Sequence, residues 1–250
     1  MSPPLIQTPD RSTFVDPSPV RDDAGLRVWR VAGQTRRLVV CFSGVGPADG
    51  ALAPEFLRLI AMTPRDHLLF IADPARSWLN RPGLIDEITA VIEAEVAATG
   101  ATQICTLGHS MGGFCAVVIS AFTRVDCAVA FAPQFSVDPA LVPAEDRWQD
   151  LRDQIPTFTI GNADDYVQPR SHYIVFFGAH RREAPQRDLV RPRPNLDLFV
   201  IPRTHHNVPQ RLKDAGILDQ ILTACFDNRL TKVENLLIKH VEGRKAALPA

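Results

Sequence analysis

One serine of this chain lies in a sequence that is typical of a covalent nucleophile. Ser110 is the centre of the string Gly-His-Ser-Met-Gly at 108–112, which has the G-x-S-x-G pattern. An apolar, β-branched run precedes this string at 103–107, and a run of small, helix-compatible residues follows at 114–121. The pattern predicts a strand, a sharp turn and a helix, with the serine hydroxyl exposed at the turn. Glycine is expected at both flanks because a side chain there would collide with the neighbouring strand and helix.

A serine hydroxyl alone is a poor nucleophile, so the chain must also supply a base and a group that orients the base. His205 and His206 follow an apolar run at 196–202, and acidic residues follow another apolar run at 173–178. The first amides of the helix after the serine point to the place where an oxyanion would form, and the helix dipole favours negative charge there. These residue types predict attack by the serine on a carbonyl group.

The elements that must position these side chains alternate along the chain. Continuous apolar runs predict strands that are buried on both faces, at 37–42, 67–73, 103–107, 127–132, 173–178 and 196–202. Helical spacing of apolar residues predicts helices between and after them, at 53–62, 84–99 and 208–226. An alternating run at 26–32 predicts an edge strand. We therefore expect an α/β protein with a mostly parallel central β-sheet flanked by helices on both faces, and exit loops that converge on one rim.

The composition excludes several classes of protein. The chain has 250 residues, of which 46% are hydrophobic, which is enough for one large core. The net charge of −1 predicts no nucleic-acid or membrane partner, and no apolar run is long enough to span a bilayer. The five cysteines are expected to be buried thiols and not disulfides or metal ligands. The N-terminus lacks the pattern of a secretory signal, so we expect a cytoplasmic protein. No C-x-x-C pair is present, so we expect no metal.

The domain organisation follows from where the periodicity weakens. Residues 1–25 are rich in Pro, Asp, Ser and Arg and predict an extended N-terminal arm, and residues 26–250 predict a single domain. Prolines punctuate 133–172, which is either a small cap over the rim or an ordinary irregular crossover, so any lid is small or minimal. Residues 227–250 predict a C-terminal helical tail.

Two motifs resemble those of a known superfamily. The string at 108–112, and the segment Ile-Pro-Arg-Thr-His-His-Asn-Val at 201–208, are similar to the nucleophile elbow and the histidine loop of α/β-hydrolase fold proteins, over about residues 26–226. The resemblance implies a serine hydrolase that cleaves a carboxylic ester or thioester of a small-molecule acyl substrate through an acyl-enzyme on Ser110, and it implies no cofactor. Two alternatives stay open, because the fold hosts many functions: an acyltransferase of the same fold, and a non-catalytic accessory or binding protein.

The resemblance also implies roles for other residues. Its register makes His206 the base, with His205 as the rival, because His205 stands where a glycine is usual. Backbone amides of Met111 and Val45 would form the oxyanion hole. Side chains on the rim loops are expected to line the acyl pocket, namely Trp78, Gln134, Phe135 and Arg76.

The acid that orients the base is expected between the serine and the histidine. Glu183 is the first candidate and Asp188 the second, because both follow the strand that immediately precedes the histidine strand. Asp164 and Asp165 are rivals that follow a strand-like run at 157–160, and their local sequence is closer to the usual acid turn. If one of them were the acid, another full strand would lie between the acid and the histidine strand, which the fold does not normally allow.

Overall fold

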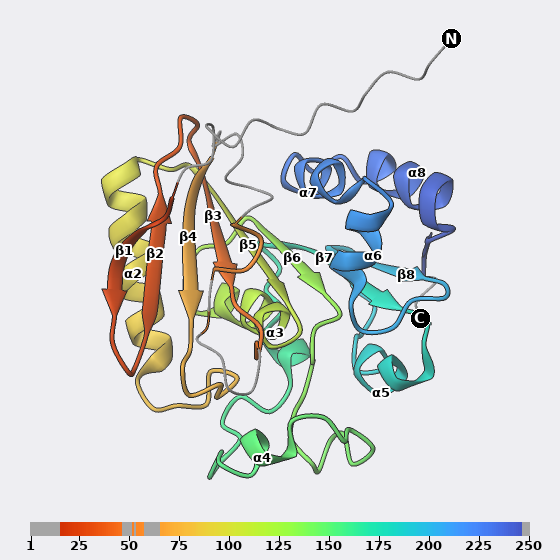
Figure 1. The fold of residues 1–250 in the computed structure, drawn as a ribbon, viewed down its shortest axis with the longest axis horizontal. Coiled ribbons are helices and arrows are strands. Elements are labelled where there is room, and N and C mark those ends of the chain that lie inside the picture. Colours follow the sequence, from red (N-terminus) through yellow and green to blue (C-terminus); the bar gives the residue numbers. More distant parts are fainter. Residues whose placement is uncertain (1–15, 47–51, 53, 58–65, 247–250) are drawn as a thin grey trace.

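The described residues, 16–46, 52, 54–57 and 66–246, form one continuous nine-stranded β-sheet in the computed structural model of the chain (Figure 1). The strands are β1 (Ser18–Asp22), β2 (Arg27–Val31), β3 (Arg37–Phe42), β4 (His67–Ala72), β5 (Gln103–His109), β6 (Cys127–Phe131), β7 (His172–Gly178), β8 (Leu196–Ile201) and β9 (Arg244–Lys245). Their order across the sheet is β1-β2-β4-β3-β5-β6-β7-β8-β9. The pairs from β4 to β8 in this order are parallel, and the antiparallel pairs are β1–β2, β2–β4 and β8–β9. The predicted mostly parallel sheet is therefore confirmed.

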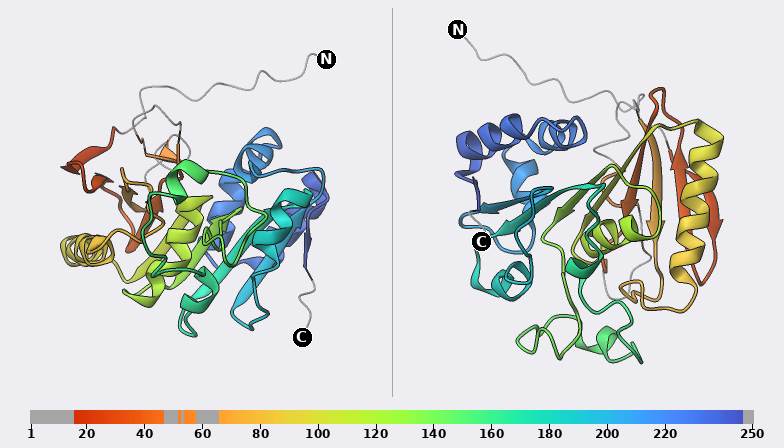
Figure 2. Two further views of the ribbon diagram at one scale, coloured as in Figure 1. Left: turned by 90° about the horizontal axis from the view of Figure 1, so that it is seen from below. Right: turned by 180° about the vertical axis from the view of Figure 1, so that it is seen from behind.

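Helices cover both faces of this sheet. They and the short 3-10 turns are α2 (Leu84–Thr99), α3 (Met111–Val118), η2 (Ile119–Ala121), α4 (Gln149–Arg152), η3 (Ala163–Tyr166), η4 (Arg181–Glu183), α5 (Ala184–Arg187), α6 (Val208–Asp214), α7 (Leu218–Phe226) and α8 (Leu230–Val241). Figure 2 shows α2 and α3 on one face, and α6 and α7 on the opposite face. The long apolar runs of β3 to β7 are buried for this reason, because neither face of a strand meets solvent.

Two contacts show that side chains of the central strands pack against helices on both faces of the sheet. Thr106 of β5 donates a hydrogen bond to the carbonyl oxygen of Ala116 in α3, at 2.8 Å. Cys127 of β6 lies against the backbone of Cys225 in α7, with Sγ 3.7 Å from the carbonyl oxygen. Cys127 pairs with the residue before Thr106, so the two side chains point to opposite faces. The sheet therefore has a hydrophobic layer on each of its two faces.

The predicted helix at 84–99 matches α2, and its end has a local cause. Gly100 adopts the left-handed conformation, with φ of 65°, and its N–H donates to the carbonyl oxygen of Val96 at 2.9 Å. The predicted helix at 208–226 is wrong as a single element. Gly216, with φ of 68°, ends the first helix, so the segment forms two helices, α6 and α7, which contact each other.

The structure also decides the edge strand predicted at 26–32 and the strand-like run at 157–160. The run at 26–32 forms β2, but this strand is not at the edge, because β1 pairs with its outer side. Residues 157–160 form no strand, so β6 and β7 are neighbours in both sequence and sheet. The predicted helix at 53–62 lies largely outside the described residues.

The segment 133–172 crosses from β6 to β7 beyond the carboxyl ends of the central strands (Figure 1). It contains only the four-residue α4 and the short η3, so it forms no separate helical lid. The described part of the chain includes all five cysteines, and each is a buried free thiol. Among the described residues, no helix is long and apolar enough to cross a membrane.

Candidate active site

Ser110 lies at the sharp turn between β5 and α3. Its backbone has φ of 58° and ψ of −120°, a conformation that is costly for a residue with a side chain. Two hydrogen bonds hold the turn: the Ser110 N–H donates to the Phe131 carbonyl oxygen at 3.0 Å, and the Gln134 N–H donates to the Ser110 carbonyl oxygen at 3.3 Å. The end of β6 therefore fixes the strained serine in place.

The glycines on both sides of Ser110 are required by close backbone contacts. A Cβ atom on Gly108 would lie 2.1 Å from the carbonyl carbon of Gly112, and one on Gly112 would lie 2.2 Å from the carbonyl oxygen of Phe42. Both distances are far below any real contact of a Cβ atom. The G-x-S-x-G spacing thus lets α3 begin directly against β5 and β3.

The Ser110 hydroxyl is buried, with 5% of the residue exposed, and not exposed at the turn as the sequence suggested. The loop after β6 covers it: Ser110 Oγ donates to Gln134 Oε1 at 3.2 Å, and the Trp78 indole N–H donates to the same oxygen at 3.2 Å. The indole fixes the orientation of the amide, because an amide nitrogen in that place would face another donor. Within the described residues, Gln134 Nε2 is buried and has no hydrogen-bond partner.

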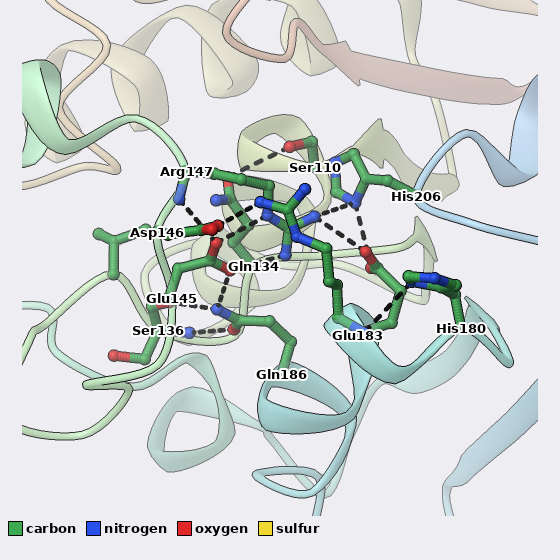
Figure 3. Close-up of polar contacts among 12 residues, drawn as sticks. Ser110, Gln134, Ser136, Glu145, Asp146, Arg147, His180, Glu183, Gln186 and His206 are labelled. Carbon is green, nitrogen blue, oxygen red and sulfur yellow. Dashed lines mark hydrogen bonds and ion pairs between the residues drawn. The ribbon is translucent and has the colours of Figure 1, made fainter.

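His206 contacts an acid from the loop after β7. Its Nδ1 lies 3.1 Å from Glu183 Oε2, and the Glu183 side chain is 2% exposed (Figure 3). Burial raises the pKa of Glu183, but the hydrogen bond and charge of His206, together with the charge of Arg147, outweigh burial and hold the pKa below its usual value. Glu183 is therefore ionised at neutral pH, as an orienting carboxylate must be.

The rival acids lie elsewhere. Asp164 is fully buried and forms a bidentate ion pair with Arg193, at 2.6 and 2.7 Å. Asp165 and Asp188 are exposed, Asp165 beside Arg191 of the connection from β7 to β8 and Asp188 beside Arg187. The structure brings none of these three carboxylates to His206.

The two candidate histidines have different surroundings. The His205 side chain is exposed, and its ring packs on that of His180 with centroids 3.9 Å apart. The backbone carbonyl oxygen of His206 accepts a hydrogen bond from His109 Nε2 at 3.0 Å. Burial, and then the charge of His206, lower the pKa of His109 to about 4, so His109 is neutral at neutral pH. His109, the residue before Ser110, thereby ties the histidine loop to the serine turn.

Arg147 is the residue of this site that sequence reasoning missed. Its Nη1 lies 2.9 Å from Glu183 Oε1 and 2.9 Å from His206 Nδ1 (Figure 3). Its other nitrogens bind Glu145 at 2.6 and 2.7 Å. Arg147 and Glu145 come from the irregular segment 133–172, which has no motif spacing that would have pointed to them.

The two amides expected to bind an oxyanion lie at the start of α3 and in the loop after β3. Met111 is the first residue of α3, where an N–H has no partner within the helix. Val45 is buried, and its carbonyl oxygen accepts a hydrogen bond from Arg76 Nε at 2.7 Å. Gly44, next to it, donates its N–H to Glu55 Oε1 at 3.0 Å. Both contacts fix the course of this loop.

The remaining pocket candidates divide between site and core. Trp78 and Gln134 meet beside Ser110 as described, whereas Phe135 is fully buried and packs in the core against Phe177, with ring centroids 6.4 Å apart. Among the described residues, no group of three His, Cys, Asp or Glu side chains is arranged to hold a metal ion.

Comparisons with known proteins give matches at the level of structure. No family profile and no curated protein sequence matches the chain. Est1E from Butyrivibrio proteoclasticus matches with a TM-score of 0.57 at 13% identity, over 87% of this chain and 98% of that one. XC6422 from Xanthomonas campestris, an α/β serine hydrolase without a lid, matches with a TM-score of 0.52 at 16% identity, over 83% and 93%.

The chain has the α/β-hydrolase fold. A third neighbour, the capsule O-acetyltransferase of Neisseria meningitidis serogroup A, matches with a TM-score of 0.63 at 11% identity, over 82% of this chain and 93% of that one. The structural neighbours of this α/β-hydrolase fold protein thus include both hydrolases and an acyltransferase. At such identities the likeness establishes the fold, and the reaction must be argued from the site.

Proposed function

We propose that this α/β-hydrolase fold protein is a serine hydrolase, which cleaves a carboxylic ester or a thioester through an acyl-enzyme on Ser110. The observation that carries the proposal is a convergence at one rim of the sheet. The strained Ser110 turn follows β5, the Glu183 loop follows β7, and the His206 loop follows β8. Ligands of parallel α/β sheets bind at this carboxyl end of the strands.

In the proposed reaction, Ser110 Oγ attacks the substrate carbonyl carbon while His206 Nε2 takes the hydroxyl proton. His206 then gives that proton to the leaving group, and an acyl-enzyme remains on the serine. Water, activated by the same histidine, releases the acid and restores the serine. Glu183 accepts a hydrogen bond from His206 Nδ1 and stabilises the imidazolium. The amides of Met111 and Val45 stabilise the oxyanion of each tetrahedral intermediate.

The first step of this reaction requires the serine side chain to turn. Ser110 Oγ donates its proton to Gln134 in the structure, and His206 Nε2 is buried without a hydrogen-bond partner among the described residues. In the proposed step, rotation of the serine side chain turns the hydroxyl from Gln134 toward His206 Nε2. Such rotamer changes are fast compared with turnover.

A cavity beside Val45 supports a substrate of modest size. Its volume is about 510 Å³, and Arg76 and Trp148 line it together with Val45. Cavities of about 300–1,000 Å³ are typical of small-molecule sites. We propose that the acyl or alcohol part of the substrate occupies this cavity.

Acyl transfer is a second candidate, which the likeness to an O-acetyltransferase fold favours. It shares the acyl-enzyme and differs only in the acceptor. A panel of p-nitrophenyl esters and acyl thioesters, with and without added alcohols or amines, tests both. Release of free acid at a rate independent of acceptor supports hydrolysis, and acyl products that increase with acceptor support transfer. No turnover of any acyl donor, by wild type beyond the level of Ser110→Ala, contradicts the proposal.

A further inference from the structure

Arg147 contacts both the base and the acid of the proposed triad. One of its nitrogens, Nη1, lies 2.9 Å from His206 Nδ1 and 2.9 Å from Glu183 Oε1. Glu183 Oε2 lies 3.1 Å from the same Nδ1. Figure 3 shows the three side chains meeting from three different segments of the chain. His206 Nδ1 therefore has two neighbours that compete for it.

The two contacts of His206 Nδ1 require opposite protonation. A guanidinium nitrogen only donates hydrogen bonds, so Arg147 needs an unprotonated Nδ1. An ionised carboxylate only accepts, so Glu183 needs a protonated Nδ1. In a neutral imidazole, these are two tautomers. Only the Nδ1–H tautomer leaves Nε2 free to take a proton from Ser110.

Arg147 is held rigidly in this position. Its side chain is 14% exposed and that of Glu145 is 3% exposed, and the two form a two-point ion pair. Gln186 Nε2 donates to Glu145 at 2.9 Å and fixes the carboxylate from the other side. The charges that face His206 are therefore Arg147, Glu183 and, through Arg147, Glu145, beside the neutral His109. An arginine that neutralises two buried carboxylates does not leave by itself.

The serine half of the site is consistent with an Nε2–H tautomer. An Nε2 lone pair facing Ser110 would be the better acceptor for the hydroxyl, yet Ser110 Oγ donates to Gln134. Within the described residues, His206 Nε2 has no partner at all. The hydroxyl proton that catalysis must move to Nε2 is thus directed to Gln134 in the resting site.

The neighbours of Arg147 along the chain connect it to the proposed substrate cavity. Asp146 and Trp148, on either side of it, both line the 510 Å³ cavity beside Val45. Trp148 has φ of 59°, so the backbone is strained at this point. A ligand in the cavity would contact the two residues that flank Arg147 in the chain.

We propose that Arg147 is a positioning residue that competes with Glu183 for His206 Nδ1, and that it holds the resting base in the Nε2–H tautomer until substrate in the cavity shifts residues 146–148. On release, one proton leaves Nε2 to solvent and one proton from solvent joins Nδ1, so the charge of the imidazole does not change. The effect of this tautomer change on catalysis rests on the proposed function of His206. The tautomer of the resting protein does not depend on that function.

The test uses three variants of the full chain. R147M removes every donor and keeps the length of the side chain. E145Q/R147M also removes one carboxylate, so that no additional uncompensated charge is buried, and it serves if R147M does not fold. The matched control is R152M: Arg152 is a buried arginine of the same segment that binds the backbone carbonyls of Val137 and Glu145 and makes no contact with His206.

The primary readout is the ring-nitrogen NMR spectrum of protein with ¹⁵N-labelled histidine at pH 7.5, with His206→Asn for assignment. We expect Nε2–H for His206 in wild type and in R152M, and Nδ1–H in R147M or E145Q/R147M. The second readout is ester hydrolysis. If about nine-tenths of the substrate-free molecules rest in the Nε2–H tautomer, R147M lowers KM, and so raises kcat/KM, by up to about tenfold, with kcat little changed, because bound substrate has already released the base in wild type.

Two results overturn the inference. One is an Nδ1–H signal in wild-type protein, and the other is an unchanged tautomer in the variants together with a fall in kcat, which would make Arg147 only a support for Glu183. A tautomer shift in a chain that turns over no acyl donor would support the inference and contradict the proposed function, so the two fail separately.

Discussion

Glu183 and His206 occupy equivalent positions beyond two adjacent parallel strands. Gly178 of β7 pairs with Ile201 of β8, and each of the two side chains follows its strand end by five residues. A Cβ atom on Gly178 would lie 2.3 Å from the carbonyl oxygens of Thr204 and His205, so the two loops touch at their base. The 3.1 Å contact between acid and imidazole is a consequence of this register.

Replacement of Ser110 by alanine should abolish turnover and leave the fold intact. Loss of one hydrogen bond to Gln134 costs about 1 kcal/mol at most, whereas loss of a serine nucleophile lowers kcat by about 10⁶ in characterised hydrolases. Thermal unfolding and ester hydrolysis are measured on the same preparation. Loss of the cooperative unfolding transition would show that the serine has a structural role instead.

His206→Ala should lower kcat by several orders of magnitude, and His205→Ala should change it by less than about threefold. The reason is that His206 contacts Glu183, whereas the exposed His205 packs on His180. A p-nitrophenyl ester assay compares the two variants directly. A larger loss for His205→Ala would reverse the assignment.

Glu183→Gln should lower kcat by about 10²–10⁴, because an amide does not select the imidazole tautomer as a carboxylate does. Asp188→Asn is the matched control, since Asp188 is exposed in the same loop, and it should have wild-type activity. Equal activities in the two variants would remove Glu183 from the proposed mechanism.

The central strands and the elbow follow from patterns that are local in sequence. Buried strands on both faces give continuous apolar runs, and the turn at Ser110 needs glycine at fixed offsets, so both are visible without a structure. The preference for Glu183 over Asp164 came from strand order alone. The structure agrees with that order because residues 157–160 form no strand and Asp164 is bound by Arg193.

Other features depend on contacts between distant segments, and no local pattern marks them. Arg147 reaches the site only through the irregular course of 133–172, and its neighbour Glu145 is an ordinary charged residue by sequence. The strand at 18–22 is largely exposed and lacks alternation, so only its pairing with β2 reveals it. The burial of Ser110 likewise depends on Gln134 and Trp78, which lie far from it along the chain.

Glu55 should make the stability of the protein depend on pH between about 4.5 and 7. Burial raises its pKa to about 7 from 4.5, although the N–H of Gly44 stabilises the charged form. The folded state therefore binds more protons than the unfolded state in this window, and the free energy of unfolding falls as pH rises through it. Urea unfolding of wild type and Glu55→Gln, compared from pH 4 to 8, isolates this contribution. A difference between the two that does not vary with pH would contradict the prediction.

Covalent labelling of Ser110 tests the proposed acyl-enzyme at its first step. The chain is incubated with a fluorophosphonate probe, and the adduct is measured by intact mass and located by peptide mapping. We expect one adduct, on Ser110, that is absent in Ser110→Ala, forms far more slowly in His206→Ala, and forms at the wild-type rate in His205→Ala. No adduct on Ser110, under conditions that fully label a control esterase, would contradict the proposal that this serine is the nucleophile.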